Sequence, residues 1–150
     1  MSAYFVDTSA LVKRYVNESG STWVRSWIER PAGNTIIASE LVAVEVYSAL
    51  ARRRRDGTLD SNAASLLQND LLGHIQNEYV IITLESKILV QARQLIDRYP
   101  LRTLDAIQLA TALYATSLFH IPLNFICADV NLLAAAAAEG FAVNNPNHHP

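Results

Sequence analysis

The sequence predicts an α/β fold, with a central and mainly parallel sheet flanked by helices. Short β-branched runs alternate with longer stretches of helical period, the pattern that such a sheet produces. The chain has 150 residues, near the usual size of one domain, and 51% of them are hydrophobic, enough to build one core. We therefore expect a single domain over residues 1–150, with a loosely packed tail at about 144–150.

The strands are expected where apolar and β-branched residues run together without a break. They are Ala3–Val6, Thr35–Ala38, Tyr79–Thr83, Asn124–Ala128 and a weaker run at Phe141–Val143. The stretches between them have helical period, at Ser9–Val16, Ser21–Arg30, Ser39–Arg55, Ser61–Asn77, Ser86–Tyr99, Thr103–Phe119 and Asn131–Glu139. Asp56 and Gly57 end the third helix, Pro100 follows the fifth, and the alanine run at 134–138 favours the last.

Composition excludes several classes of protein. The net charge of -2 gives no overall attraction to nucleic acid or to an anionic membrane, so any such contact needs a local patch. The single cysteine, Cys127, excludes an internal disulfide and a thiolate zinc cluster, and suits a reducing compartment. The chain shows neither a signal peptide nor an apolar run of membrane-spanning length. We expect a soluble, cytoplasmic protein without a membrane partner.

Two aspartates follow predicted strands. Asp7 comes directly after the first strand, and Asp129 follows the strand that begins at Asn124. Open parallel sheets bind ligands at the edge where their strands end. Taken alone, each of these aspartates could equally well be a cap of the helix that follows it. For the first helix the cap could be Asp7 or Thr8.

Two further candidate acids, Glu45 and Asp105, lie on predicted helices. The helical neighbours of Glu45 are mostly apolar, so its carboxylate needs a partner outside its own helix. Glu40 lies in a first helical turn, where an acid suits the helix dipole, and we interpret it as structural. Asp105 has Leu101 and Leu109 around it and is expected to face inward, although an acid in a first turn is also favourable without any function.

The possible meeting of these acids at one place favours a functional site over helix capping. Taken together, Asp7, Glu45, Asp105 and Asp129 would meet at one edge of the sheet, where carboxylates repel one another unless a cation neutralises them. Oxygen ligands alone favour Mg²⁺, with Mn²⁺ as the other candidate.

The chain resembles the PIN domain ribonucleases and, among them, the VapC toxins of toxin-antitoxin pairs. The resemblance covers nearly the whole sequence and rests on "VDTSALVKRY", "SELVAVEVYSALARR", "LRTLDAIQLATAL" and "FICADVNLLAAAAAEGFAV". It implies a three-layer α/β/α sandwich with Asp7, Glu45, Asp105 and Asp129 as a catalytic, metal-binding site. Thr8 and Ser9 would support that site by hydrogen bonds to the first aspartate or its water. Cys127 departs from the family pattern, because a threonine or serine commonly stands there and a thiol is a weaker donor.

The resemblance also implies an activity and partners. The activity would be magnesium-dependent hydrolysis of RNA phosphodiester bonds by water, without a covalent intermediate. The partners would be an RNA substrate, a VapB-like antitoxin that blocks the acidic site, and a second copy of the toxin in a homodimer. A catalytically silent PIN domain that binds RNA or protein is the alternative.

Basic residues near such a site would hold the RNA backbone. Arg52–Arg55 spread around their helix, and Arg52 lies two turns beyond Glu45 on roughly the same stripe, which favours it for a phosphate contact. Lys13, Arg14 and Arg102 are weaker candidates. Trp23 and Trp27 are one turn apart, for which core packing is the simplest explanation. The four histidines, His74, His120, His148 and His149, show no metal-ligand spacing.

Two other classes of protein that use an aspartate at the end of a strand do not fit the sequence. A haloacid-dehalogenase-type phosphotransferase needs a second acid two residues after its first aspartate, and that position is Ser9. A receiver domain needs a lysine late in the sheet, and no lysine follows Lys87.

Overall fold

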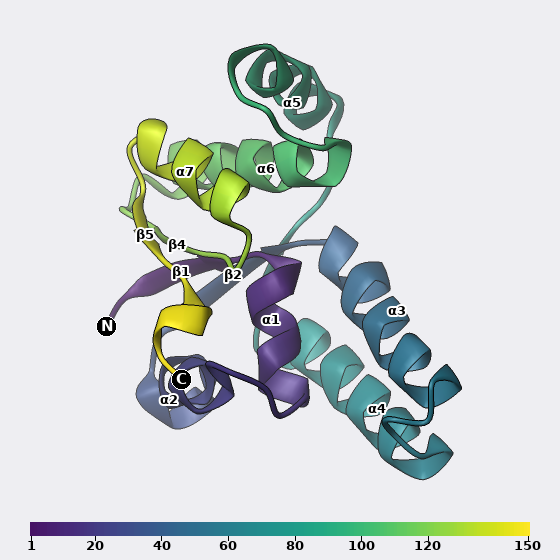
Figure 1. The fold of residues 1–150 in the computed structure, drawn as a ribbon. Coiled ribbons are helices and arrows are strands. Elements are labelled where there is room, and N and C mark those ends of the chain that lie inside the picture. The colour runs from purple at the N-terminus through teal and green to yellow at the C-terminus, as the bar shows by residue number, and fades with distance from the viewer.

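The computed structural model shows a five-stranded, all-parallel sheet with helices on both faces (Figure 1). The strands are β1 (Ala3–Val6), β2 (Thr35–Ser39), β3 (Val80–Ile82), β4 (Asn124–Ile126) and β5 (Ala142–Asn144). Their order across the sheet is β3-β2-β1-β4-β5, and every neighbouring pair is parallel. The predicted α/β fold around a parallel sheet is confirmed.

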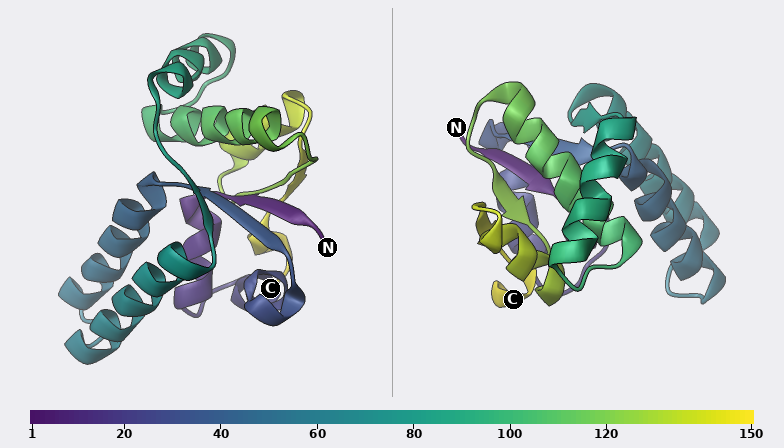
Figure 2. Two further views of the ribbon diagram at one scale, coloured as in Figure 1. Left: turned by 180° about the vertical axis from the view of Figure 1, so that it is seen from behind. Right: turned by 90° about the horizontal axis from the view of Figure 1, so that it is seen from above.

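Seven α-helices form the outer two layers of a three-layer sandwich. They are α1 (Thr8–Tyr15), α2 (Ser21–Ile28), α3 (Leu41–Arg55), α4 (Ser61–Asn77), α5 (Ser86–Arg98), α6 (Thr103–Phe119) and α7 (Val130–Ala138). Helices α1 to α4 lie on one side of the sheet, whereas α6 and α7 lie on the other and α5 stacks on α6 (Figures 1 and 2). Two short 3-10 helices, Arg30–Ala32 and Pro146–His148, were not predicted. No helix combines the length and apolar character that crossing a membrane requires.

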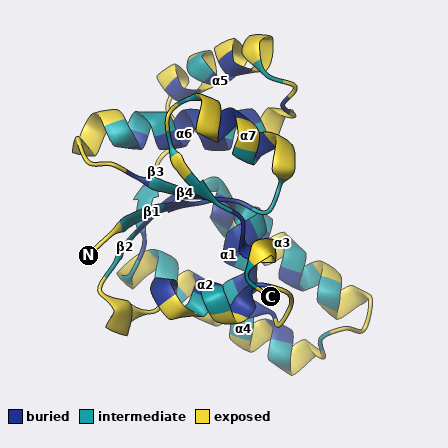
Figure 3. Ribbon diagram, turned by 60° about the vertical axis from the view of Figure 1, so that its left-hand side comes forward, coloured by how far each residue is buried: buried dark blue, intermediate teal, exposed yellow.

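Each face of the sheet has its own apolar core. Phe5 and Ile37 pack toward α5, α6 and α7, whereas Val6 and Ile36 pack toward α1 to α4. Successive residues of a strand point to opposite faces, so a strand covered on both sides reads as a continuous apolar run. The dark inner faces of the helices in Figure 3 show where these two cores lie.

The strand order places a switch point at the centre of the sheet. From β1 the chain proceeds outward through β2 to β3, and β4 and β5 then fill the other side of β1. Parallel pairing of Val6 with Ile126 aligns the carboxyl ends of β1 and β4. Ligands of open α/β sheets bind at such a point, because the loops leaving the two strands separate there.

Several predicted element ends are displaced by one or two residues, and two of these displacements have a clear local cause. The third helix begins at Leu41 and not at Ser39, because Ser39 completes β2 and its hydroxyl accepts the N–H of Leu41 at 3.2 Å. Strand β4 ends at Ile126, two residues early, because the N–H of Ala128 turns to the hydroxyl of Ser9 at 2.9 Å.

The tail at 144–150, expected to be loosely packed, docks against α2. Asn145 and Pro146 are buried, and the ring of His149 stacks on Trp23 with centroids 4.1 Å apart. Gly20 permits this approach, since a Cβ there would lie 2.3 Å from the carbonyl oxygen of Pro146 and its φ of +87° also favours glycine. Composition suggested fraying, but these contacts hold the tail in place.

Candidate functional site

Asp7 follows the last residue of β1 and caps α1. Its Oδ2 accepts hydrogen bonds from the backbone N–H (3.1 Å) and the hydroxyl (2.6 Å) of Ser9. Burial raises the pKa of Asp7 to about 6 although the Ser9 hydrogen bonds oppose it, and the charges of Asp105 and Glu45 raise it further. Asp7 is thus both a helix cap and a buried carboxyl among like charges.

Asp129 repeats this arrangement after β4. Its Oδ1 caps α7 by accepting the N–H of Leu132 at 2.9 Å. Because β1 and β4 are parallel neighbours, Asp7 and Asp129 leave the sheet at the same edge. Each acid uses one oxygen for capping, so the capping role does not exclude contacts by the other oxygen.

Glu45 projects from α3 and is held by residues of α1 and α6. Its Oε1 accepts the hydroxyl of Thr8 at 2.9 Å and the amide of Gln108 at 3.3 Å, whereas its Oε2 has no hydrogen bond within the chain. The partner outside its own helix that the apolar face demands is therefore present. Thr8 and Ser9 were both expected to support Asp7 or its water; Ser9 bonds to Asp7, whereas the hydroxyl of Thr8 bonds to Glu45.

Asp105 lies in the first turn of α6 beside an exposed arginine. Nε of Arg102 is 3.3 Å from Oδ2 of Asp105, and its Nη2 is 3.5 Å from Oδ2 of Asp129. Burial raises the pKa of Asp105, the hydrogen bond from Arg102 opposes this, and the charge of Asp129 adds to it. Arg102 thus supplies counter-charge to two of the acids.

Of the four carboxylates, Asp105 and Glu45 lie close enough to raise the pKa of Asp7, and Asp129 raises that of Asp105, but no three of them are placed to hold a metal ion. The guanidinium of Arg102 contacts two of them, and Glu45 is held by neutral donors. The chemistry of the set nonetheless fits a hard divalent cation: all donors are oxygens, and one carboxyl is buried among like charges with a raised pKa. A cation would relieve that repulsion.

Cys127 lies between the two strand-end acids. Its Sγ is 3.6 Å from Oδ2 of Asp7 and accepts the N–H of Asp129 at 3.1 Å. Burial raises the pKa of the thiol, and the charge of Asp7 acts in the same direction. Ser9, whose hydroxyl is 3.7 Å from the sulfur, joins the same contact. The thiol therefore lies beside Asp7 at the position where the family commonly has threonine or serine.

A groove extends from the acids along α3. It consists of three adjoining hollows of about 450 to 470 Å³, each sharing lining residues with the next. Glu45 and Leu104 line the first two, and Arg52 lines the second and third. Asp105 stands at one end and Arg53 at the other. Arg102 also lines the end at Asp105, and Asp56 lines the end at Arg53, so charged side chains of both signs lie along the groove.

The basic candidates differ in their freedom to bind a ligand. Arg52 is exposed and makes no ion pair, whereas Arg53 pairs with Glu18 at 2.9 Å. The ammonium of Lys13 is buried, 3.0 Å from Glu18 and 2.8 Å from the carbonyl of Ser19. Lys13 therefore fixes the loop after α1 and does not extend into the groove.

Arg14 is also held within the chain. Its guanidinium donates to the hydroxyl of Tyr79 at 2.8 Å and to Glu78 at 3.1 Å. The hydroxyl of Tyr15 joins this network and bonds to Nδ1 of His74 at 2.8 Å. The network links α1 to α4, so Arg14 and His74 have packing partners of their own.

Gln108 is the site residue that the sequence analysis missed. It is 1% exposed and lies one turn after Asp105, and its amide contacts both Glu45 and Thr8 at 3.3 Å. The available signal was a glutamine on the same helix face as Asp105 and Ala112, in a helix that is mostly apolar. Such a side chain needs a buried hydrogen-bond partner, and Glu45 is that partner.

Three residues considered at the sequence level are structural. Trp27 is buried and stacks on Tyr4 with centroids 4.4 Å apart, and Trp23 meets its edge at 5.5 Å, so the packing interpretation is confirmed. Glu40 accepts the N–H of Leu84 and thereby ties the start of α3 to the loop after β3.

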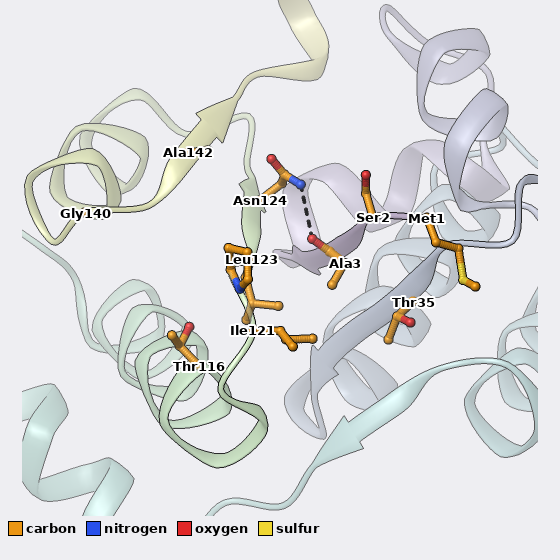
Figure 4. Close-up of a pocket in the computed structure, with 11 residues that line it drawn as sticks. Met1, Ser2, Ala3, Thr35, Thr116, Ile121, Leu123, Asn124, Gly140 and Ala142 are labelled. Atoms are coloured by element: carbon orange, nitrogen blue, oxygen red, sulfur yellow. Dashed lines mark hydrogen bonds between the residues drawn. The ribbon is translucent and has the colours of Figure 1, made fainter.

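The largest hollow of the molecule lies at the opposite edge of the sheet (Figure 4). It measures about 650 Å³ and is lined by the first residue of each of four strands: Ala3, Thr35, Asn124 and Ala142. The amide of Asn124 donates to the carbonyl of Ala3 at 3.2 Å across its floor. No charged side chain lines it, so it offers none of the chemistry that the carboxyl edge provides.

Comparison with known proteins agrees with this fold. The family model of the PIN domain matches residues 4–119. FitAcB from Neisseria gonorrhoeae aligns with a TM-score of 0.69 and 16% identity, covering 97% of this chain and 99% of that one. VapC20 from Mycobacterium tuberculosis, a sarcin-ricin-loop-cleaving toxin, aligns with a TM-score of 0.64 and 18% identity, covering 93% and 96%.

A toxin-antitoxin complex from Klebsiella pneumoniae aligns with a TM-score of 0.58 and 19% identity, covering 95% of this chain and 97% of that one. A search of curated protein sequences finds no match. The fold and the family model together define the class: the chain belongs to the PIN domain family. Its structural neighbours include VapC and other toxin-antitoxin proteins.

Proposed function

We propose that the protein is a magnesium-dependent endoribonuclease toxin that hydrolyses RNA phosphodiester bonds. The observation that supports the proposal is a PIN fold in which Asp105 and Glu45 lie close enough to raise the pKa of Asp7, and Asp129 that of Asp105. Glu45 and Asp105 also line a groove that contains Arg52 and Arg53. Membership of the PIN domain family and the toxins among the structural neighbours support the same activity. Cellular RNA is the substrate class, and the cytoplasm is the compartment in which we place the reaction.

The four acids would hold Mg²⁺, or Mn²⁺ in its place. When bound, the cation would stabilise negative charge at the attacked phosphate. It would also lower the pKa of a bound water molecule, so that a nucleophile can form at neutral pH. Among residues of the chain, Asp7 and Asp129 are fixed by their capping bonds, and Ser9 orients Asp7 through two hydrogen bonds. Thr8 orients Glu45. These bonds hold the carboxylates in place before RNA arrives.

Arg52 and Arg102 are the residues that we assign to the RNA backbone. Arg52 lines the groove next to Glu45, and Arg102 is 81% exposed at the acidic end. Arg102 pairs with Asp105 and Asp129, and a cation at these acids would release its guanidinium for a phosphate. Lys13 and Arg14 are left out of this assignment, because ion pairs with Glu18 and Glu78 hold them within the chain.

The partners of the toxin would be a cognate VapB-like antitoxin and a second copy of the chain. Complexes of toxin with antitoxin among the structural neighbours support the first partner. Val44 and Leu104 are exposed by 70% and 47% and line the groove around Glu45, so a protein that covers the site would also bury apolar surface there. The homodimer rests on the family resemblance.

A nuclease assay tests the proposal. Purified protein is incubated with total cellular RNA in Mg²⁺ or in chelator, and the new ends are mapped by sequencing. We expect cleavage with Mg²⁺ only, and none from Asp7→Asn or Asp105→Asn in folded protein. Wild-type cleavage by either variant at ordinary Mg²⁺ concentrations would overturn the site assignment. RNA binding without cleavage would favour the alternative of a catalytically silent PIN domain.

A further inference from the structure

Gln108 occupies a position where an apolar side chain would pack with less difficulty. It is 1% exposed in α6, and the neighbouring residues of its helix, Ala106, Leu109 and Ala112, are all buried. Its Oε1 is buried and has no hydrogen-bond partner. An unpaired buried acceptor is unfavourable, and methionine would fill the same space without one. Packing alone therefore does not explain a glutamine at this position.

The donor half of the Gln108 amide is fully used. Nε2 lies 3.3 Å from Oε1 of Glu45 and 3.3 Å from Oγ1 of Thr8. Thr8 donates its own hydroxyl to the same Oε1 at 2.9 Å. Two donors from two different helices, α1 and α6, thus converge on one oxygen of a side chain from a third, α3.

The two oxygens of Glu45 therefore differ in their hydrogen bonding. Oε1 is saturated by Thr8 and Gln108, whereas Oε2 accepts no hydrogen bond from the chain. The amide nitrogen must face Glu45, because the opposite orientation would bring the amide oxygen against a carboxylate oxygen. Fixing one oxygen in this way leaves the other as the only oxygen of Glu45 that is available to a cation.

Resting on the proposed nuclease function, we propose that Gln108 is a positioning residue that acts with Thr8 to hold Glu45 for cation binding. Residues that orient a metal-binding carboxylate by hydrogen bonds govern metal affinity, and their loss costs about tenfold or more in affinity or activity. Gln108 touches neither RNA nor the reacting atoms in this role.

Direct measurement of Mn²⁺ binding tests the role without relying on activity. Free Mn²⁺ is followed by electron paramagnetic resonance as protein is added, for wild type and for Gln108→Met. We expect the variant to bind Mn²⁺ about tenfold more weakly. Its thermal stability should be equal or higher, because methionine removes the unpaired acceptor. Cleavage should recover when Mg²⁺ is raised, since the defect lies in affinity.

Gln68→Met is the matched control. Gln68 is 5% exposed in α4 and donates to the carbonyl of Tyr47, on the same helix α3 that carries Glu45. It tests whether loss of any buried glutamine against α3 loosens the site. We expect wild-type Mn²⁺ affinity from this control, and equal weakening by both variants would overturn the positioning role.

Two further variants protect the test against misfolding and separate it from the proposed function. Thr8→Val removes the second donor to the same oxygen and should weaken Mn²⁺ binding in the same direction. In a Glu45→Gln background, Gln108→Met should have no further effect, because positioning acts only through Glu45. If wild type binds no Mn²⁺, the proposed function fails; if wild type binds and cleaves while Gln108→Met is unchanged, only the positioning role fails.

Discussion

The sulfur of Cys127 lies 3.6 Å from Oδ2 of Asp7, across the boundary between β4 and β1. The same sulfur accepts the backbone N–H of Asp129. One small side chain thus contacts both acids that leave the central strands. A thiol donates weakly, so the contact to Asp7 contributes less than a hydroxyl would in the same place.

Cys127→Thr is expected to change activity only modestly. The new hydroxyl would donate to Asp7 in place of the thiol, and a net hydrogen bond contributes about 1 kcal/mol, which corresponds to less than about tenfold in rate. Cleavage rate and Mn²⁺ affinity measure the outcome. Cys127→Val is the matched control, because it has the shape of threonine without the hydroxyl. Loss of metal binding in the threonine variant would contradict a supporting role for this position.

Asp7→Asn is expected to stabilise the metal-free protein at neutral pH. The folded protein keeps the proton of Asp7 up to about pH 6, whereas the unfolded chain releases it near the ordinary value of 3.8. The folded state therefore binds more protons between these values, so the free energy of unfolding falls as pH rises through them. A shift of this size corresponds to roughly 3 kcal/mol, which asparagine would recover.

Urea unfolding in chelator between pH 4 and pH 7 measures this effect. The variant should lose the part of the decline that Asp7 causes, and the raised pKa of Asp105 should leave a smaller slope over that window. Asp56→Asn serves as a control, because hydrogen bonds from Thr58 lower the pKa of Asp56. Its titration therefore lies below this window, and the variant should keep the wild-type slope. A wild-type slope in Asp7→Asn would show that burial of this charge is not the cause.

The sequence predicted those parts of the site that depend on local pattern. An acid after an apolar strand must lie at the end of that strand, so the positions of Asp7 and Asp129 followed directly. Glu45 followed from the apolar neighbours on its own helix, and its need for an outside partner is met. The parallel sheet and its seven helices followed from hydrophobic period in the same way.

The rest of the site depends on how helices pack, which period does not reveal. Thr8 bonds to Glu45 and not to Asp7 because α1 lies against α3, and the two residues are far apart in the chain. Gln108 was missed because a single glutamine does not disturb the period of α6. Lys13 was predicted to contact RNA because its position in the sequence is close to Asp7. The loop after α1 places Glu18 beside its ammonium, and period does not reveal that contact.

Lys13→Met is expected to lower the free energy of unfolding by about 1 to 3 kcal/mol, because it leaves Glu18 and a loop carbonyl without their buried donor. Its effect on the salt dependence of RNA binding should be negligible. Urea unfolding and RNA titration at several salt concentrations measure the two quantities. A flatter salt dependence with unchanged stability would return Lys13 to the RNA-binding surface.

Arg52→Glu is expected to weaken RNA binding across different sequences. Arg52 is exposed, makes no ion pair and lines the groove beside Glu45, so we predict one contact to a phosphate. Loss of that contact should reduce the slope of log affinity against log salt by about one, because counterion release scales with the phosphates neutralised. Metal affinity should stay unchanged or rise, because Arg52 forms no ion pair with any of the four acids.

Arg54→Glu is the control, because Arg54 is also exposed and makes no ion pair but points about 200 degrees away from Arg52 on an ideal helix. The two variants carry the same change in net charge, so a difference between them reports position and not overall field. RNA affinity is measured against salt for both, with Mn²⁺ binding as a check on the acidic site. Equal losses at Arg52 and Arg54 would indicate a diffuse basic field, and no loss at Arg52 would remove it from the groove.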